Sequence, residues 1–328
     1  MGKDSKKTEI LCAGEVLFDF ISVDRGKGIG ESLNFKKRMG GSPFNVCCGL
    51  SALGESCSFF TQLGDDSFGK AIYEYLGTRD IDTQYAFVKK GAKTSLAFAG
   101  VDESGKADYE FYRENTADVS IKEQAAEQVV FDNISIFHFG SLAIVDEPGA
   151  KTYLKLFEKA KTKYVLTAFD PNIRPFCIND KEKYITLAMQ IIQRVDVLKC
   201  SDEDLYYITG ESKPEKALKL LPQNPKRMDF VTLGKEGCLI HHDDAYKYIT
   251  GYKVDVSDTV GCGDSFMSGI LKVINNSFLS DETDRIVLME EAANFAVACA
   301  AIVASREGAA DAMPTEKEVY QFIADRAD

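Results

Sequence analysis

The sequence lacks the short motifs that assign many chains of its length to a nucleotide-binding class. None of its 328 residues form the pattern G-x-x-x-x-G-K-[ST], which excludes a P-loop mechanism. The pattern G-x-G-x-x-G is also absent, so dinucleotide binding has no support. The nine cysteines are scattered and no two have C-x-x-C spacing. This argues against a disulfide framework or a zinc site and indicates a reducing compartment.

Positive charge is in deficit. The chain has 39 Lys and Arg residues against 51 Asp and Glu residues, a formal net charge of −12. A surface this acidic repels a phosphate backbone, so we expect no nucleic acid partner. An anionic ligand would have to be held by local features such as a helix N-terminus, a few basic side chains or a bridging metal.

Long apolar segments are lacking as well. Residues 1–7 are charged and contain no apolar stretch, so we expect no signal peptide. The longest apolar run, residues 292–305, is shorter than the ~18 residues that a membrane span requires. We therefore expect a cytoplasmic chain that does not engage a membrane.

What is present indicates an α/β fold. Hydrophobic residues make up 45% of the chain and charged residues 27%, the usual mix for a protein with a real core. Apolar runs of strand length alternate with helical patterns, which is typical of βαβ units on a parallel sheet. The predicted core strands are 10–13, 58–62, 134–139, 165–169, 195–199 and 230–233. The predicted helices are 43–53, 69–78, 148–160, 183–194, 202–209, 264–274, 284–304 and 315–326.

Two segments break the alternation. Residues 18–23 with 33–38, and residues 85–88 with 95–101 and 109–112, have strand patterns without intervening helices. They predict one small antiparallel layer, a lid formed by about 15–38 and 84–115 on a single unit spanning 1–328. The alternative is an extra edge on the main sheet.

A glycine-rich turn at residues 258–264 carries the strongest chemical signal. Gly261 and Gly263 bracket Cys262, and Asp264 follows where a helical pattern begins. Glycines let backbone N–H groups converge, and the helix N-terminus adds partial positive charge, so the turn can form an anion hole. A carboxylate at the same place can accept a proton from an attacking hydroxyl. The alternative is that Asp264 only caps its helix.

A second glycine motif precedes the first long helix. Gly40 and Gly41 allow close backbone approach to a ligand, and Asn45 offers a donor and an acceptor. The alternative is a tight turn with Pro43 at the first helical position.

Together the two motifs resemble the signatures of the ribokinase-like (PfkB) carbohydrate kinases. The resemblance implies a mostly parallel sheet flanked by helices on both faces and a small antiparallel lid. It implies that Asp264 is the catalytic base, that residues 261–263 form the anion hole, and that Gly40, Gly41 and Asn45 hold sugar hydroxyls. The family usually has Ala at the position of Cys262, but an anion hole built from backbone N–H groups tolerates Cys.

Three further segments, residues 14–19, 111–118 and 170–175, resemble the fructokinase branch of this family. Asp19 follows the first strand and could accept hydrogen bonds from vicinal hydroxyls. The residues that the resemblance implies in sugar binding also include Glu15, Phe98, Tyr112, Arg113 and Asn172, and Arg174 is implied in stabilising the transferred group. Each segment has a plain alternative, namely a turn at Asp19, a surface salt bridge at Arg113, and a turn at residues 170–171.

The resemblance also implies a nucleotide site with metal ions. Asp204 is expected to contact Mg²⁺ through water, although the alternative for Ser201 nearby is a helix cap. A K⁺ site is implied at Asp258, Val260, Val303 and Gly308. The implied nucleotide-binding residues are Lys199, Ser201, Thr232, Gly234, Lys235, Gly237 and Asn294.

The histidines carry little information. His138 lies in an apolar strand and is predicted to be a core residue, whereas His241 and His242 are predicted to be exposed in a hairpin.

The sequence therefore predicts an ATP- and Mg²⁺-dependent sugar kinase that phosphorylates D-fructose, with position 6 implied by resemblance alone. The alternatives are a kinase for 2-keto-3-deoxygluconate or another ribokinase-like substrate, and a non-catalytic regulator on a kinase fold. We expect a monomer or a homodimer formed through the lid.

Overall fold

A large, mostly parallel sheet forms the centre of the protein. The computed structural model describes residues 9–24, 26–101, 107–277 and 284–326. Within these ranges nine strands form one sheet in the order β13-β12-β11-β10-β9-β8-β1-β4-β5, in which only the pairs β11–β12 and β12–β13 are antiparallel. Its strands are β1 (Glu9–Ala13), β4 (Cys57–Gly64), β5 (Ala86–Lys89), β8 (Ile134–Gly140), β9 (Leu166–Asp170), β10 (Val197–Ser201), β11 (Met228–Thr232), β12 (Gly237–His242) and β13 (Ala245–Thr250).

Strand β1 shows why these strands are apolar throughout. Its side chains alternate between two hydrophobic cores, with Ile10 and Cys12 in one and Leu11 and Ala13 in the other. A strand that is covered on both faces needs an apolar residue at every position.

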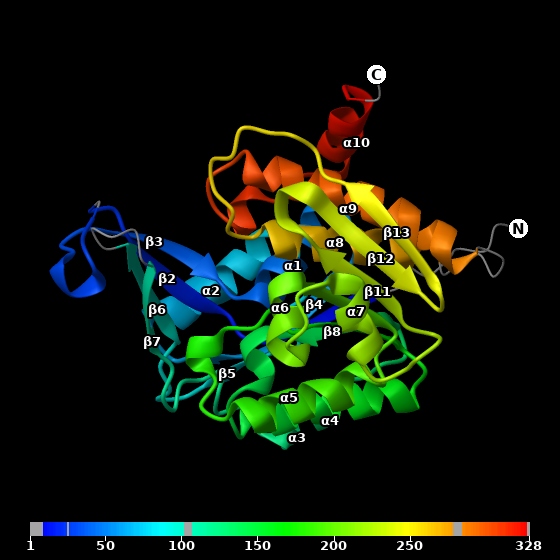
Figure 1. The fold of residues 1–328 in the computed structure, drawn as a ribbon. Coiled ribbons are helices and arrows are strands. Elements are labelled where there is room, and N and C mark those ends of the chain that lie inside the picture. The colour runs from blue at the N-terminus through cyan, green and yellow to red at the C-terminus, as the bar shows by residue number, and fades with distance from the viewer. Residues whose placement is uncertain (1–8, 25, 102–106, 278–283, 327–328) are drawn as a thin grey trace, which may run out of the picture.

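Helices cover both faces of the sheet, above and below it in Figure 1. One core contains residues of α1 (Ser42–Ala52), α2 (Ser67–Thr78), α8 (Cys262–Ser277), α9 (Arg285–Ala304) and α10 (Glu316–Ala324). The other contains residues of α3 (Glu123–Glu127), α4 (Gly149–Thr162), α5 (Lys181–Ile192), α6 (Asp202–Thr209) and α7 (Pro214–Leu220). Short 3-10 turns occur at Ile29–Glu31, Ser141–Ile144, Pro175–Cys177, Gly234–Glu236 and Ala310–Ala312. The predicted long helices and core strands are all present, with bounds shifted by a few residues at most.

A second, four-stranded sheet stands to one side, at the left of Figure 1. It has the order β3-β2-β6-β7 and consists of β2 (Leu17–Ser22), β3 (Phe35–Gly40), β6 (Leu96–Val101) and β7 (Ala107–Tyr112). We call it the lid sheet. Its outer pairs are antiparallel as predicted, whereas its central pair, β2–β6, is parallel.

The strand predicted at residues 85–88 does not belong to the lid sheet. As β5 it pairs in parallel with β4 at the edge of the main sheet, so its assignment to the small layer is wrong and the alternative, an extra edge strand, is correct for it. The physical reason is the connection, because α2 lies between β4 and β5 and a crossover helix returns the chain in parallel.

Helix α9 has the length and composition of a membrane span but the surroundings of a core helix. It is 20 residues long with a mean hydropathy of 1.8, and 67% of its apolar window is buried within the fold. It packs against α8, α10 and the β12–β13 hairpin. A predominantly apolar helix is expected in such an enclosed position. The residues that bear on the signal-peptide expectation, 1–8, lie outside the described residues.

The histidines are partly as predicted. His138 is buried in β8, and burial lowers its pKa to about 3, so the ring is neutral. The prediction that His241 and His242 are solvent-exposed is wrong, because both are half-buried. Nδ1 of His241 lies 2.8 Å from the buried carboxylate of Asp229, which also pairs with Arg227.

Two glycines in helices test how tightly α8 packs. A Cβ on Gly269 of α8 would lie 2.8 Å from Cα of Ala296 in α9, whereas a Cβ on Gly77 in α2 would meet nothing. Gly77→Ala should raise or preserve the thermal midpoint, since Ala is better than Gly in a helix by ~1 kcal/mol. Gly269→Ala should lower it, because overpacking costs about 1–3 kcal/mol. Thermal unfolding measures both, and a stabilised Gly269→Ala would contradict the tight α8–α9 contact.

Candidate active site

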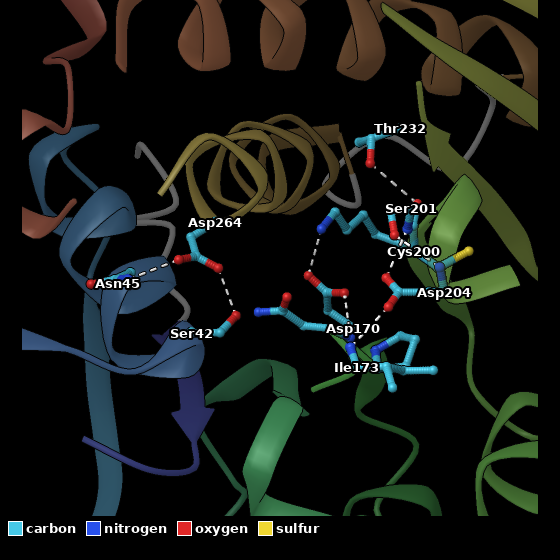
Figure 2. A network of polar contacts seen from close by, with 12 residues as sticks. Ser42, Asn45, Asp170, Ile173, Cys200, Ser201, Asp204, Thr232 and Asp264 are labelled. Atoms are coloured by element: carbon cyan, nitrogen blue, oxygen red, sulfur yellow. Dashed lines mark hydrogen bonds and ion pairs between the residues drawn. The ribbon is translucent and has the colours of Figure 1, made fainter. Parts of the chain in front are cut away.

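The predicted catalytic and sugar motifs meet at the carboxyl ends of the parallel strands. Open α/β sheets bind their ligands at this edge. Figure 2 shows the two halves of the site, with Asp264, Ser42 and Asn45 on one side and Asp170 and Asp204 on the other.

The carboxylate of Asp264 is fixed by two side chains from α1. Asp264 lies in the first turn of α8 and is 7% exposed. Its Oδ1 accepts a hydrogen bond from Oγ of Ser42 (2.6 Å), and its Oδ2 accepts one from Nδ2 of Asn45 (2.8 Å). The catalytic and sugar motifs are thus in direct contact through the residue expected to be the base. Ser42 was not predicted as a site residue, although its position inside the glycine motif was a signal for it.

The turn before Asp264 requires glycine for steric reasons. Gly261 has φ +83°, and a Cβ there would lie 2.9 Å from Cα of Ala309. The first N–H groups of α8 have no intrahelical partner, as at any helix start, and the N–H of Cys262 makes only a long bond of 3.4 Å to the carbonyl of Thr259. Burial raises the pKa of the Cys262 thiol to about 11, so this thiol is neutral and a poor nucleophile near neutral pH.

A buried ion pair lies beside this turn. Nζ of Lys199 is 2.8 Å from Oδ2 of Asp170, and both side chains are almost completely buried. A Cβ on Gly263 would lie 3.0 Å from the same Nζ, so the ammonium group is next to the predicted anion hole. Burial raises the pKa of Asp170 to about 6, although Lys199 opposes this effect. Asp170, which the sequence indicated only as part of a turn, is therefore a central residue of the site.

Asp204 and Ser201 have a structural role at the start of α6. They form a reciprocal capping box, in which the Asp204 Oδ2 accepts the N–H of Ser201 and the Ser201 Oγ accepts the N–H of Asp204. The Asp204 Oδ1 accepts the N–H of Ile173 (2.8 Å), which ties the loop after β9 to α6. The helix-cap alternative for Ser201 is correct.

The described residues do not form a preformed metal cage. They contain no group of three or more His, Cys, Asp or Glu side chains placed to hold a metal ion, and both carboxylate oxygens of Asp204 already accept backbone hydrogen bonds. Proteins commonly bind Mg²⁺ through one or two carboxylates together with substrate phosphates and water. Contact between Asp204 and Mg²⁺ stays a prediction.

The glycine pair of the sugar motif makes room for the carboxylate of Asp19 and for the backbone of Glu15. A Cβ on Gly40 would lie 2.1 Å from Oδ2 of Asp19, and Gly41 has φ +112° with its missing Cβ 2.5 Å from the carbonyl of Glu15. Burial raises the pKa of Asp19 to about 6, and the positive charges of Arg174 and Arg38 oppose this shift.

Glu15 and Arg113 belong to a buried charge cluster. Arg113 donates to Asp118 (2.9 Å) and Asp146 (2.8 Å), so it forms a buried salt bridge and not the surface one considered as the alternative. Oε1 of Glu15 accepts the N–H of Ser42 (3.2 Å). Burial raises the pKa of Glu15 to about 7, and the charge of Arg113 partly offsets this effect. Contact of Glu15 and Arg113 with a sugar stays a prediction.

Phe98 and Tyr112 are not placed beside Asp19. In the lid sheet Asp19 is opposite Ala97, whereas Phe98 is opposite Phe20, and paired residues project from the same face. Phe98 stacks on Phe20 with ring centres 5.0 Å apart, and Tyr112 contacts Phe98 from the same face. Asp19 therefore projects from one face of the lid sheet, whereas Phe98 and Tyr112 project from the other, and contact of Phe98 and Tyr112 with a sugar stays a prediction.

The loop after β9 approaches the lid sheet. Asn172 has φ +35°, and the exposed Arg174 donates to the carbonyl oxygens of Asn172 and Ile173. The ring of Phe176 stacks on Tyr109 of β7 with ring centres 5.3 Å apart. Sequence reasoning missed this contact, since no motif contains it.

Besides Lys199 and Ser201 on β10, the predicted nucleotide residues lie on β11, β12, the turn between them and α9. Thr232 ends β11 and donates to the carbonyl of Cys200 (3.4 Å). Gly234 and Gly237 have φ +56° and +103°, and the exposed Lys235 lies between them. Asn294 is exposed on α9 and donates to the carbonyl of Glu290. Their contact with a nucleotide stays a prediction.

The carboxylate of Asp258 does not fit the predicted K⁺ site. Its Oδ2 accepts the guanidinium of Arg38 (2.6 Å) and the N–H of Gly308 (3.4 Å), and its Oδ1 accepts the N–H of Val260 (3.1 Å). Partial burial opposes ionisation, but these donors outweigh it and hold the pKa of Asp258 below its ordinary value. Val303 is fully buried in α9. A carboxylate already paired with a guanidinium is a poor ligand for a second cation.

Comparison with known proteins identifies the family. The model of the pfkB family carbohydrate kinases matches residues 7–316. The chain belongs to this family. Probable fructokinase-2 of Arabidopsis thaliana is 33% identical to the kinase over 317 residues, which cover 96% of this chain and 95% of that one.

Solved structures agree with this assignment. Fructokinase from Xylella fastidiosa with bound ATP has a TM-score of 0.85 and 26% identity and covers 98% of this kinase and 100% of that chain. A putative ribokinase II from E. coli has a TM-score of 0.83 at 21% identity and covers 97% of this kinase and 99% of that chain, which shows the shared fold. The kinase is an ATP-dependent sugar phosphotransferase with a ribokinase-like α/β fold, as predicted.

The raised pKa of the buried Glu15 predicts that the stability of this kinase depends on pH. Folding raises the pKa of Glu15 from 4.5 to about 7, so the folded state binds this proton more tightly than the unfolded state. The free energy of unfolding should therefore fall as pH rises through this range, by on the order of 3 kcal/mol for this group alone. Glu15→Gln keeps an acceptor for Ser42 and has no proton to lose, so its thermal midpoint should fall less between about pH 5 and about pH 8. Parallel pH profiles for the two proteins would contradict the raised pKa.

Proposed function

We propose that this kinase transfers the γ-phosphoryl group of ATP to D-fructose, with Asp264 as the general base. The observation that carries the proposal is the position of the Asp264 carboxylate, which joins the sugar motif at Ser42 and Asn45 to the glycine turn before α8. The choice of fructose rests on relatives named fructokinases, 30–33% identical over nearly the whole chain. Phosphorylation at position 6 follows from the family resemblance.

The residues divide the chemistry between them. Asp264 takes the proton as the sugar hydroxyl forms its bond to the γ-phosphorus, and ADP leaves with the electrons of the broken P–O bond. The N–H groups of residues 261–263 and the N-terminus of α8 stabilise negative charge on the transferred group. Lys199, next to Gly263, adds a positive charge at the same place. Arg174 is a further candidate for that role, since it is exposed in the loop beside the site.

The sugar is held from the lid sheet and from α1. Asp19 on β2 and Asn45 on α1 supply acceptors and a donor suited to hydroxyl groups. Mg²⁺ arriving with ATP would neutralise charge on the phosphates, and the residues that the structure describes offer it no closed protein cage. Closure of the lid sheet over the sugar would exclude water and suppress ATP hydrolysis.

The compartment and partners of the kinase are inferred from its sequence. We infer a cytoplasmic enzyme without nucleic acid or membrane partners, on the basis of its acidic charge and scattered free cysteines. It would act as a monomer or as a homodimer formed through the lid sheet.

ADP release with a panel of acceptors tests the proposal. Fructose should exceed ribose, 2-keto-3-deoxygluconate and adenosine as the acceptor. Asp264→Asn should lower kcat by roughly 10²- to 10⁴-fold, the usual contribution of a general base. Its thermal midpoint should stay close to that of the unaltered protein, which separates a chemical defect from a folding defect.

The outcomes separate the parts of the proposal. If another acceptor dominates while Asp264→Asn stays inactive, the base assignment survives and the sugar assignment is wrong. If Asp264→Asn turns over normally, Asp264 is only a helix cap. If no acceptor releases ADP above background, the proposed substrate class is wrong.

A further inference from the structure

Arg38 connects the lid sheet to the loop that carries the anion hole. It lies on β3, two residues before the glycine pair, and is paired with Asp19 across the β2–β3 ladder. Paired residues share a face, so Arg38 projects on the same side as Asp19, toward the main sheet. Its Nη1 reaches the Oδ2 of Asp258 at 2.6 Å, across 220 positions of the sequence.

Asp258 passes this contact on to the anion hole. Its carboxylate accepts the N–H of Val260, the residue before Gly261, and the N–H of Gly308, the residue before Ala309. Ala309 is the neighbour that a Cβ on Gly261 would strike. The carboxylate of Asp258 therefore sets the relative position of both segments that enclose the glycine turn, and Arg38 is its counter-ion.

A neighbouring ion pair provides a contrast. Lys36, on the same face of β3, pairs with Glu307, a residue that Nη2 of Arg38 also reaches at 3.4 Å. The side chains of Lys36 and Glu307 are 52% and 63% exposed. The side chains of Arg38 and Asp258 are only 18% and 20% exposed. An exposed pair contributes little because water screens it, whereas a short, charge-assisted and shielded bond holds its geometry.

We propose that Arg38 is a positioning residue for phosphoryl transfer, whose guanidinium locks β3 to the anion-hole loop and supplies the positive charge at Asp258, so that turnover needs no added K⁺. The proposal rests on the proposed function of this site. Arginine suits the role because its charge is permanent and its planar fork fixes direction as well as distance.

Four proteins and two salts test the proposal. Arg38→Met keeps the length of the side chain but removes its charge, Arg38→Lys keeps the charge but loses the fork, and Lys36→Met is the matched control on the same strand face. Each protein is assayed with fructose and MgATP in KCl and in choline chloride at equal ionic strength. Thermal midpoints are measured in both salts without substrates.

The unaltered kinase should have the same kcat in both salts within about twofold, and its thermal midpoint should not depend on the cation. Arg38→Met should lower kcat by roughly tenfold or more while KM for fructose changes less, because the lost contact orients the transferred group. Arg38→Lys should recover part of the loss. Lys36→Met should stay within about twofold of the unaltered protein.

The proposal is overturned if K⁺ strongly activates or stabilises the unaltered kinase, or if Arg38→Met behaves like Lys36→Met. If Arg38→Met does not fold, Arg38→Lys decides by the same comparison. If no protein phosphorylates fructose, the proposed function fails on its own. The thermal midpoints then decide on Arg38, and a K⁺-dependent midpoint of the unaltered protein would overturn its role.

Discussion

The site depends on one carboxylate that is held where two helix N-termini meet. Asp264 lies in the first turn of α8, and its two oxygens accept hydrogen bonds from Ser42 and Asn45 in the first turn of α1. Both helix ends contribute partial positive charge to the same small volume, which suits a site that binds anionic groups. The sugar-facing and phosphate-facing parts of the chain are thereby held together before any ligand arrives.

Buried charges beneath this centre limit how it can move. Glu15 accepts the backbone N–H of Ser42, and Arg113 lies between Asp118 and Asp146. Removing such charges from water is costly, so each must keep its partner, and breaking one contact leaves another charge unpaired. The Lys199–Asp170 pair acts similarly on the other side of the site. These clusters convert the ends of several strands into one rigid edge.

Most helices and strands of the main sheet could be predicted from the sequence, because their apolar patterns and turn residues are local. The apolar composition of β1 predicts a strand that is covered on both faces. The spacing of the glycines at 261–263 predicts the turn. The pleat of the lid sheet is different. Whether Phe98 faces the same way as Asp19 depends on the register between β2 and β6, which strand patterns alone do not specify.

Contacts between segments far apart in the sequence could not be predicted either. Nothing near Arg38 indicates that its partner is Asp258, and nothing near Asp204 indicates that both its oxygens are taken by backbone N–H groups. Ser42 sat inside a recognised motif, yet its bond to Asp264 depends on how α1 and α8 cross. Motifs located the residues of the site, and only packing assigned their partners.

A single residue connects the lid sheet to α1. Strand β3 ends at Gly40 and α1 begins at Ser42, so Gly41 is the one residue between the lid sheet and the helix whose side chains bind Asp264. Its backbone, at φ +112°, is a conformation that few other residues adopt. A displacement of β3 that Gly41 did not absorb would therefore also move Ser42 and Asn45, the two donors that orient the Asp264 carboxylate.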